Sequence, residues 1–161
     1  MPSGRVRSPG RRVHVRSGAE ALTVARRVTS RPARPETVAL LLDDCCVCRA
    51  CLVVEGTTEP DDVLSLARLL AEASEREASI HAVVLVSVRR HAVDAAAVVG
   101  RRGRERARDD VDRLLELLEL FDGVGVELVD WFVLAGGTAA SLRALTGLPS
   151  SWPAAPECGA G

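Results

Sequence analysis

The chain has 161 residues, a formal net charge of −1 at pH 7 and a hydrophobic content of 47%. This length and composition favour one globular domain with a substantial core and argue against a chain disordered throughout. No apolar run approaches the roughly 20 residues of a membrane span, and no signal-peptide core follows the arginine-rich start. We therefore expect a cytoplasmic protein with no membrane association, whose 2% aromatic content leaves an aliphatic core.

Residues 1–33 are predicted to form an arginine-rich arm that is partly disordered and carries a short helix. Residues 1–17 are rich in Pro, Gly, Ser and Arg, which rarely build a packed core, whereas residues 18–28 fit the helix. Because Glu20 is the only acid here, the arm could contact nucleic acid or an acidic partner. A solvated leader is the competing interpretation. The chain contains arginine and no lysine, and this compositional bias weakens the meaning of any arginine cluster.

Residues 34–148 are predicted to form the folded domain, followed by a Pro- and Gly-rich tail over residues 149–161. Short apolar runs between turn residues indicate strands, and apolar residues at helical spacing indicate helices. The predicted elements are a strand at 36–44, its antiparallel partner at 48–57, a helix at 59–77, a buried strand at 82–86, a loop at 91–108, a helix at 109–123, one strand or a bent pair of strands at 124–137 and a short helix at 138–147. This order predicts an α/β fold, a three-layer α-β-α domain with a mixed central sheet.

The predicted helix over 109–123 has two features that place it. Asp109 or Asp110 can cap its start, and Gly123 can end it. Its expected buried stripe is Val111, Leu114, Leu115, Leu118 and Phe121.

Four cysteines in the segment "CCVCRAC" form the strongest local signal, namely Cys45, Cys46, Cys48 and Cys51. Zinc requires four converging soft ligands, usually from two separate knuckles, and this chain has one cluster. In a hairpin, alternation would point Cys46 and Cys48 away from the other two. We therefore expect small residues in a solvent-facing turn, reduced in the cytosol, with a zinc site as the alternative.

Two further motifs have weaker meaning. The run "RRGRERARDD" at 101–110 could grip phosphate, but it lacks aromatic stacking residues, and a solvated loop is the preferred interpretation. The "GGT" at 136–138 could bind an anion through backbone N–H groups, although a turn explains it better.

Several phrases together resemble a known family. They are "RPETVALLLDD", "VVEGTTEPDDVLSLARLLAEA", "AVVLVSV" and "DDVDRLLELLELFDGVGVELVDWFVLAGG". In this order they resemble the RadC-like branch of the JAB/MPN (JAMM) domains over about residues 34–148. The most specific part is the helix followed by "GVELVDWFVLAGG".

The resemblance implies a zinc hydrolase ancestry, because active family members look like enzymes that cleave amide or isopeptide bonds. They use a glutamate as the base, and two histidines and an aspartate as metal ligands. Carried over by position, Glu36 stands at the glutamate and Asp110 at the aspartate. The two histidine positions hold Ser87 and Arg89, and the position of the proline that follows holds Arg90. The family's Pro-Ser-Gly signature is missing, and its serine position falls near Ala107.

The departures at Ser87 and Arg89 predict a site without metal. A serine hydroxyl is a poor zinc ligand, and a guanidinium is not a ligand. An arginine about 4 Å from a dication costs on the order of 8 kcal/mol at an effective dielectric constant near 20. We therefore expect Arg89 to pair with Glu36 or Asp110 in place of zinc.

A displaced zinc site is the remaining catalytic alternative. His81 and His91 lie near the site in sequence, with Asp94 as the nearest acid and His14 in the arm. Neither His81 nor His91 has a partner at ligand spacing.

The sequence thus predicts a non-catalytic RadC/JAB-like pseudoenzyme without a cofactor that acts as a binding or scaffolding module for a protein partner. The alternatives are a zinc-dependent metallohydrolase with rearranged ligands and a DNA-associated accessory protein, in keeping with the DNA-repair label of the family. Nucleic-acid binding through the arm and homo-oligomerisation stay open.

Overall fold

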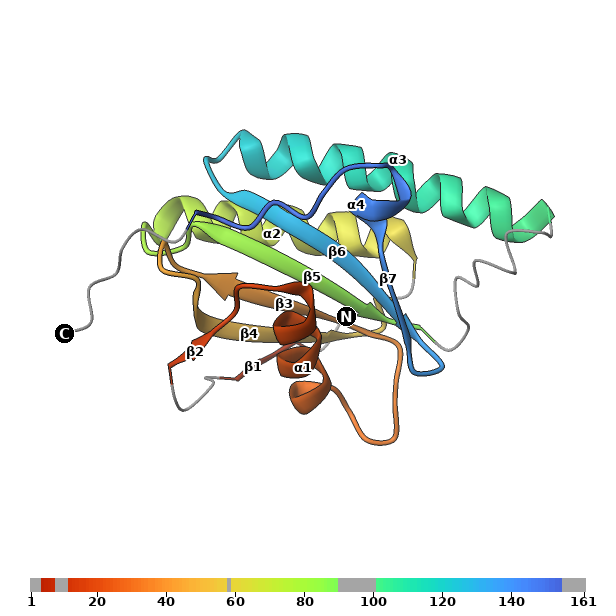
Figure 1. Cartoon of the computed structure of the whole chain (residues 1–161), viewed down its shortest axis with the longest axis horizontal. Coiled ribbons are helices and arrows are strands. Elements are labelled where there is room, and N and C mark those ends of the chain that lie inside the picture. The colour runs from red at the N-terminus through yellow and green to blue at the C-terminus, as the bar shows by residue number, and fades with distance from the viewer. Residues whose placement is uncertain (1–3, 8–11, 58, 90–100, 155–161) are drawn as a thin grey trace.

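The computed structural model describes residues 4–7, 12–57, 59–89 and 101–154, which form a mixed α/β fold around one sheet (Figure 1). The elements are β1 (Gly4–Arg7), β2 (Val13–His14), α1 (Gly18–Val28), β3 (Glu36–Leu42), β4 (Val47–Glu55), α2 (Pro60–Arg76), β5 (Ala82–Val88), α3 (Arg101–Asp122), β6 (Glu127–Ala135), β7 (Thr138–Ser141) and α4 (Leu142–Leu145). The seven-stranded sheet has the order β1-β4-β3-β5-β6-β7, and β2 pairs with β4 beside this path. The predicted α/β class with a mixed sheet is confirmed.

Helices cover both faces of the sheet. Helices α2 and α3 lie side by side on one face, and α1 lies on the other (Figure 1). Successive strand residues point to opposite faces, so Ala39 and Val83 join the core under α2 and α3, whereas Val38 and Val84 join the core under α1. We call these the α2/α3 face and the α1 face.

Strand β5 lies in the middle of the sheet and is buried along its whole length. It pairs antiparallel with β3 and parallel with β6. A parallel pair brings both carboxyl ends to the same edge of the sheet, which is where α/β folds usually place their ligands. The residue after β5, Arg89, is held at this edge by its own N–H, which donates to the carbonyl oxygen of Leu134 at 2.8 Å.

The structure corrects three local predictions. Strands β1 and β2 form within a segment predicted to be disordered, because both pair with the outer edge of β4. Helix α3 begins at Arg101, inside the predicted loop, and Asp110 therefore lies well within the helix. The predicted helix over 138–147 is wrong in its first part, because Gly136 and Gly137 have φ of 55° and 84° and form a tight hairpin turn into β7.

Asp130 is a buried carboxylate that ties the C-terminal segment to β6. It accepts hydrogen bonds from the backbone N–H of Trp131 and from the hydroxyls of Ser141 and Ser150, at 2.8, 2.7 and 2.6 Å. The backbone N–H of Arg143 also donates to it at 3.3 Å. This central aspartate is therefore fully used by the fold.

We expect Asp130→Ala to lower the free energy of unfolding by about 1–3 kcal/mol, because buried donors lose their charged acceptor. Ser150→Ala is the matched control, since it removes one of these hydrogen bonds and should cost less. Urea unfolding followed by tryptophan fluorescence measures both values. Equal losses in the two variants would contradict the central role of Asp130.

Candidate functional site

A buried ion pair joins the end of β5 to the middle of α3. Arg89 donates from both terminal nitrogens to the two carboxylate oxygens of Asp110, each at 2.8 Å. The exposed fractions of these side chains are 4% and 0%. Two parallel charge-assisted hydrogen bonds are the strongest geometry that an arginine and a carboxylate can adopt. Both oxygens of Asp110 are therefore occupied by the guanidinium.

Helix α3 brings Asp110 to this position because the residue lies in the buried stripe of the helix. The stripe consists of Asp110, Leu114, Leu117 and Phe121, all with an exposed fraction of 0%. Their spacings of four, three and four residues place them on one side of the helix. The predicted stripe was wrong in part, since Leu115 is 49% exposed. A carboxylate thus occupies a position where the helical pattern calls for an apolar residue.

Trp131 connects the ion pair with Ser87. The Arg89 guanidinium carbon lies 5.9 Å from the centre of a Trp131 ring, within the range of a cation–π interaction. The indole Nε1–H of Trp131 donates to the Ser87 hydroxyl at 2.9 Å. Ser87 and Thr37 share a further hydrogen bond at 2.9 Å. The two histidine positions of the resemblance are therefore occupied by side chains that are bound into the core.

Glu36 lies on the opposite side of the sheet. It pairs in register with Val88, whose side chain belongs to the α1 face, and facing residues in a ladder point to the same side. Its carboxylate accepts from the backbone N–H and the hydroxyl of Ser30 at 2.5 and 2.9 Å. The structure thus brings Ser87, Arg89 and Asp110 together and leaves Glu36 outside this group.

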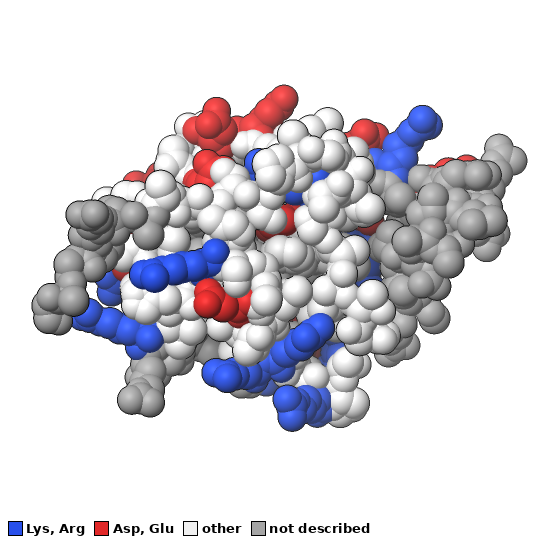
Figure 2. Space-filling view, in the orientation of Figure 1, with Lys and Arg blue, Asp and Glu red and all other residues white. Residues whose placement is uncertain are grey.

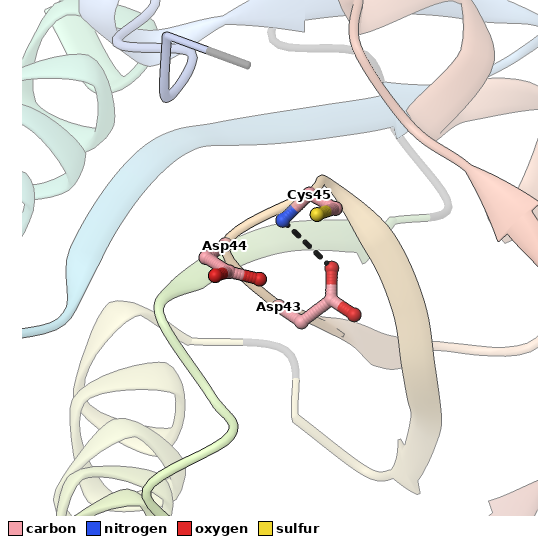
Figure 3. Close-up of side chains that lie close together, drawn as sticks. All are labelled: Asp43, Asp44 and Cys45. Atoms are coloured by element: carbon pink, nitrogen blue, oxygen red, sulfur yellow. Dashed lines mark hydrogen bonds between the residues drawn. The ribbon is translucent and has the colours of Figure 1, made fainter. Parts of the chain in front are cut away.

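The four clustered cysteines do not converge on one point. Asp43, Asp44 and Cys45 lie close together in the turn between β3 and β4 (Figure 3). However, Cys45 is disulfide-bonded, so its sulfur is not a thiolate ligand, and this differs from the expected reduced state. Asp43 accepts hydrogen bonds from the backbone N–H groups of Cys45 and Val47. It also forms an ion pair with Arg49. These contacts make Asp43 the stabiliser of the turn.

The other three cysteines are buried, which is contrary to the predicted solvent-facing turn. Cys46 has a φ of 58° at the turn, and its sulfur faces the carbonyl oxygen of Pro153 at 3.9 Å. The sulfurs of Cys48 and Cys51 lie 3.5 Å apart and share a hydrogen bond. The segment therefore holds two cysteines in the turn, the disulfide-bonded Cys45 and the buried Cys46, followed by one close thiol pair.

The remaining candidate residues lie away from Arg89 and Asp110 or outside the described residues. His81 precedes β5, at the opposite end of that strand from Arg89, and His14 lies in β2. Arg90, His91 and Asp94 lie outside the described part of the chain, so the displaced zinc site stays a prediction.

Charge is unevenly spread over the surface. On the face shown in Figure 2, arginines lie mainly over the lower part, which α1 and the N-terminal segment occupy in Figure 1, and acidic side chains line the upper edge along α3. Helix α1 contributes Arg26 and Arg27 in its last turn. Among the described residues, none of the helices combines the length and hydrophobicity needed to cross a membrane.

The comparisons with known proteins give no family to which the chain can be assigned. No protein-family model matches the sequence, and a comparison with curated proteins finds no match.

Sequence reasoning missed two residues that build the site, Thr37 and Trp131, and it also missed Ser30, which holds Glu36 on the other face. Trp131 offered a signal, because a buried indole N–H requires a hydrogen-bond acceptor and the chain has two tryptophans. Thr37 and Ser30 offered none, since their partners are distant in sequence or lie across a loop.

We expect Arg89→Met to lower the free energy of unfolding by about 3–5 kcal/mol, because Asp110 would remain as an uncompensated buried charge. The double variant Arg89→Met with Asp110→Leu should be more stable than Arg89→Met alone. A double-mutant cycle measured by urea unfolding gives the coupling.

Arg113 provides the control, since it pairs with Asp61 at 2.6 Å on the surface between α3 and α2. Arg113→Met should change stability little, because exposed ion pairs contribute little. Additive losses for Arg89 and Asp110 would contradict the coupled pair.

Proposed function

We propose that the chain is a non-catalytic RadC/JAB-like domain that acts as a binding or scaffolding module. The observation that supports this proposal is the bidentate pair of Arg89 with Asp110, because it places a fixed positive charge at a metal position of the resemblance. The proposed three-layer JAB-like architecture agrees with the presence of helices on both faces of the sheet.

The residues present do not fit a zinc site of this kind. A dication near Arg89 would meet a repulsion on the order of 8 kcal/mol at a separation of about 4 Å and an effective dielectric constant near 20. It would also have to displace the guanidinium from both oxygens of Asp110. Ser87 is engaged by Trp131 and Thr37 and adds no imidazole. The proposal therefore involves no step that depends on a metal.

The hydrolase alternative has less support for a second reason. In the resemblance, a glutamate receives the proton of the attacking water, which requires it to lie within hydrogen-bond reach of the reacting atoms. Glu36 is on the α1 face and is bound by Ser30, so the sheet separates it from Asp110. Base and ligand are thus divided between two faces.

A groove at the sheet edge supports the binding role. It has a cavity volume of about 690 Å³ and lies between β4 and α2, with Leu52, Val54 and Leu69 among its lining residues. Leu69 is 65% exposed, although its neighbours Leu66 and Leu70 are buried. Binding pockets of this size are commonly lined by apolar side chains with a polar rim, here supplied by Glu55 and Asp62.

The proposed descent from a zinc hydrolase can be tested by placing histidines at the two positions where the family has its zinc ligands. The wild-type chain should bind zinc only substoichiometrically and should not hydrolyse an isopeptide substrate, because Arg89 opposes the metal. The double variant Ser87→His with Arg89→His would supply two imidazoles beside Asp110, and we expect it to bind zinc close to one equivalent. Mass spectrometry of the native protein measures the stoichiometry, and circular dichroism checks the fold.

The control pair is Val86→His with Val88→His, which has the same spacing on the α1 face and no access to Asp110. It should bind no zinc. Adding Asp110→Asn to the Ser87/Arg89 variant should abolish its binding. A folded double variant that ignores zinc, or a wild-type chain that binds it stoichiometrically, would contradict the proposal.

A further inference from the structure

Strand β4 contains a bulge between its two close cysteines. The ladder with β3 pairs Leu41 with Ala50 and the next residue, Leu42, with Cys48, so Arg49 is the extra residue. In a regular strand, residues three apart point to opposite faces. The bulge removes this alternation. As a result, Cys48 and Cys51 both point into the core of the α1 face.

The two thiols are placed as a pair. Their sulfurs are 3.5 Å apart and share a hydrogen bond, and the exposed fractions of the residues are 2% and 0%. This bond lowers the pKa of the Cys51 thiol, while the same bond and burial raise the pKa of Cys48. Cys46 differs, because burial raises the pKa of its thiol and its sulfur faces a carbonyl oxygen.

We propose that Cys48 and Cys51 form an oxidisable dithiol that closes into a disulfide within β4. A peroxide is the oxidant class that fits this chemistry. The Cys51 thiolate attacks one peroxide oxygen, the O–O bond breaks, and a sulfenic acid forms with release of hydroxide. The Cys48 thiol then attacks that sulfur, the S–O bond breaks, and the thiol proton joins the departing hydroxide, so that this step forms one S–S bond and one water.

The surroundings favour a disulfide over a bound metal ion. Among the described residues, no third histidine, cysteine or carboxylate ligand joins this pair in a group that could hold a metal. A metal held by two thiolates would bring charge into a cluster of valines and leucines, and burying charge is costly. A disulfide is neutral and needs no counterion.

Access to the sulfurs requires local opening of the covering segment. Val15 and Ala21 lie in the same core cluster, and β2 pairs with β4 at Cys48. Short edge strands with few partners open at low free energy compared with the whole domain. Peroxide can therefore reach the pair without global unfolding.

The position of Arg49 gives a direct assay, because trypsin cleaves between the two cysteines. The full chain is treated with hydrogen peroxide, free thiols are blocked with N-ethylmaleimide, and the digest is analysed by mass spectrometry with and without reductant. We expect a reductant-sensitive link between the peptide ending at Arg49 and the peptide beginning at Ala50, with fragmentation assigning it to Cys48 and Cys51.

Variants identify the sulfurs involved. The link should disappear in Cys48→Ser and in Cys51→Ser and should persist in the matched control Cys46→Ser, whose residue is equally buried. The wild-type assay alone remains decisive if a variant fails to fold. Accumulation of sulfinic acid at Cys51 without a link, or persistence of the link in Cys48→Ser, would overturn the proposal.

Discussion

The constraint on which the site depends is the burial of two opposite charges at the end of the central strand. The side chain of Asp110 is fully buried and that of Arg89 nearly so, and neither charge can be left alone there without a large cost in stability. Their pairing fixes the distance between β5 and α3. The guanidinium also lies close to the ring of Trp131, whose indole N–H donates to Ser87, and Ser87 in turn shares a hydrogen bond with Thr37. Within the described residues, Arg89 Nε lacks a hydrogen-bond partner. The guanidinium thus makes its two hydrogen bonds to Asp110 and lies near an aromatic ring, while its Nε–H makes none.

Alternation along the strands decides which residues can act together. Because β3 and β5 pair in regular register, their side chains sort into two separate cores. This sorting places Glu36 with Ser30 and Arg89 with Asp110, although the sequence analysis had grouped Glu36 with Arg89 and Asp110. The exception is the bulge at Arg49, where the sorting fails and two cysteines share a side. Regular alternation along β5 therefore places Ser87 and Arg89 on the face of Asp110. Loss of alternation at the β4 bulge places Cys48 and Cys51 on one face.

Much of the fold could be predicted from local pattern. The bounds of α1 agree with the prediction, and α2 and β5 nearly do, because helical spacing, Pro60 and a continuous apolar run are strong local signals. Asp110 was one of the two partners expected for Arg89. The expectation came from charge, because a carboxylate can neutralise the guanidinium. The burial of Cys46, Cys48 and Cys51 could not be predicted, since it depends on a bulge and on a cover from the N-terminal segment. Strand β7 was missed for another reason, because pairing with β6 after the Gly136–Gly137 turn overrode the helical preference of its alanines.

The N-terminal segment has a role that its composition hides. Helix α1 and Val15 supply one wall of the core that contains Val38, Leu40 and Val86. A recombinant fragment beginning at residue 34 would lack that wall. It would expose the aliphatic side chains on this face of the sheet to water. Such surfaces associate readily with one another. Any shortened version for crystallisation or for fusion to another protein should therefore keep the residues from β2 onward.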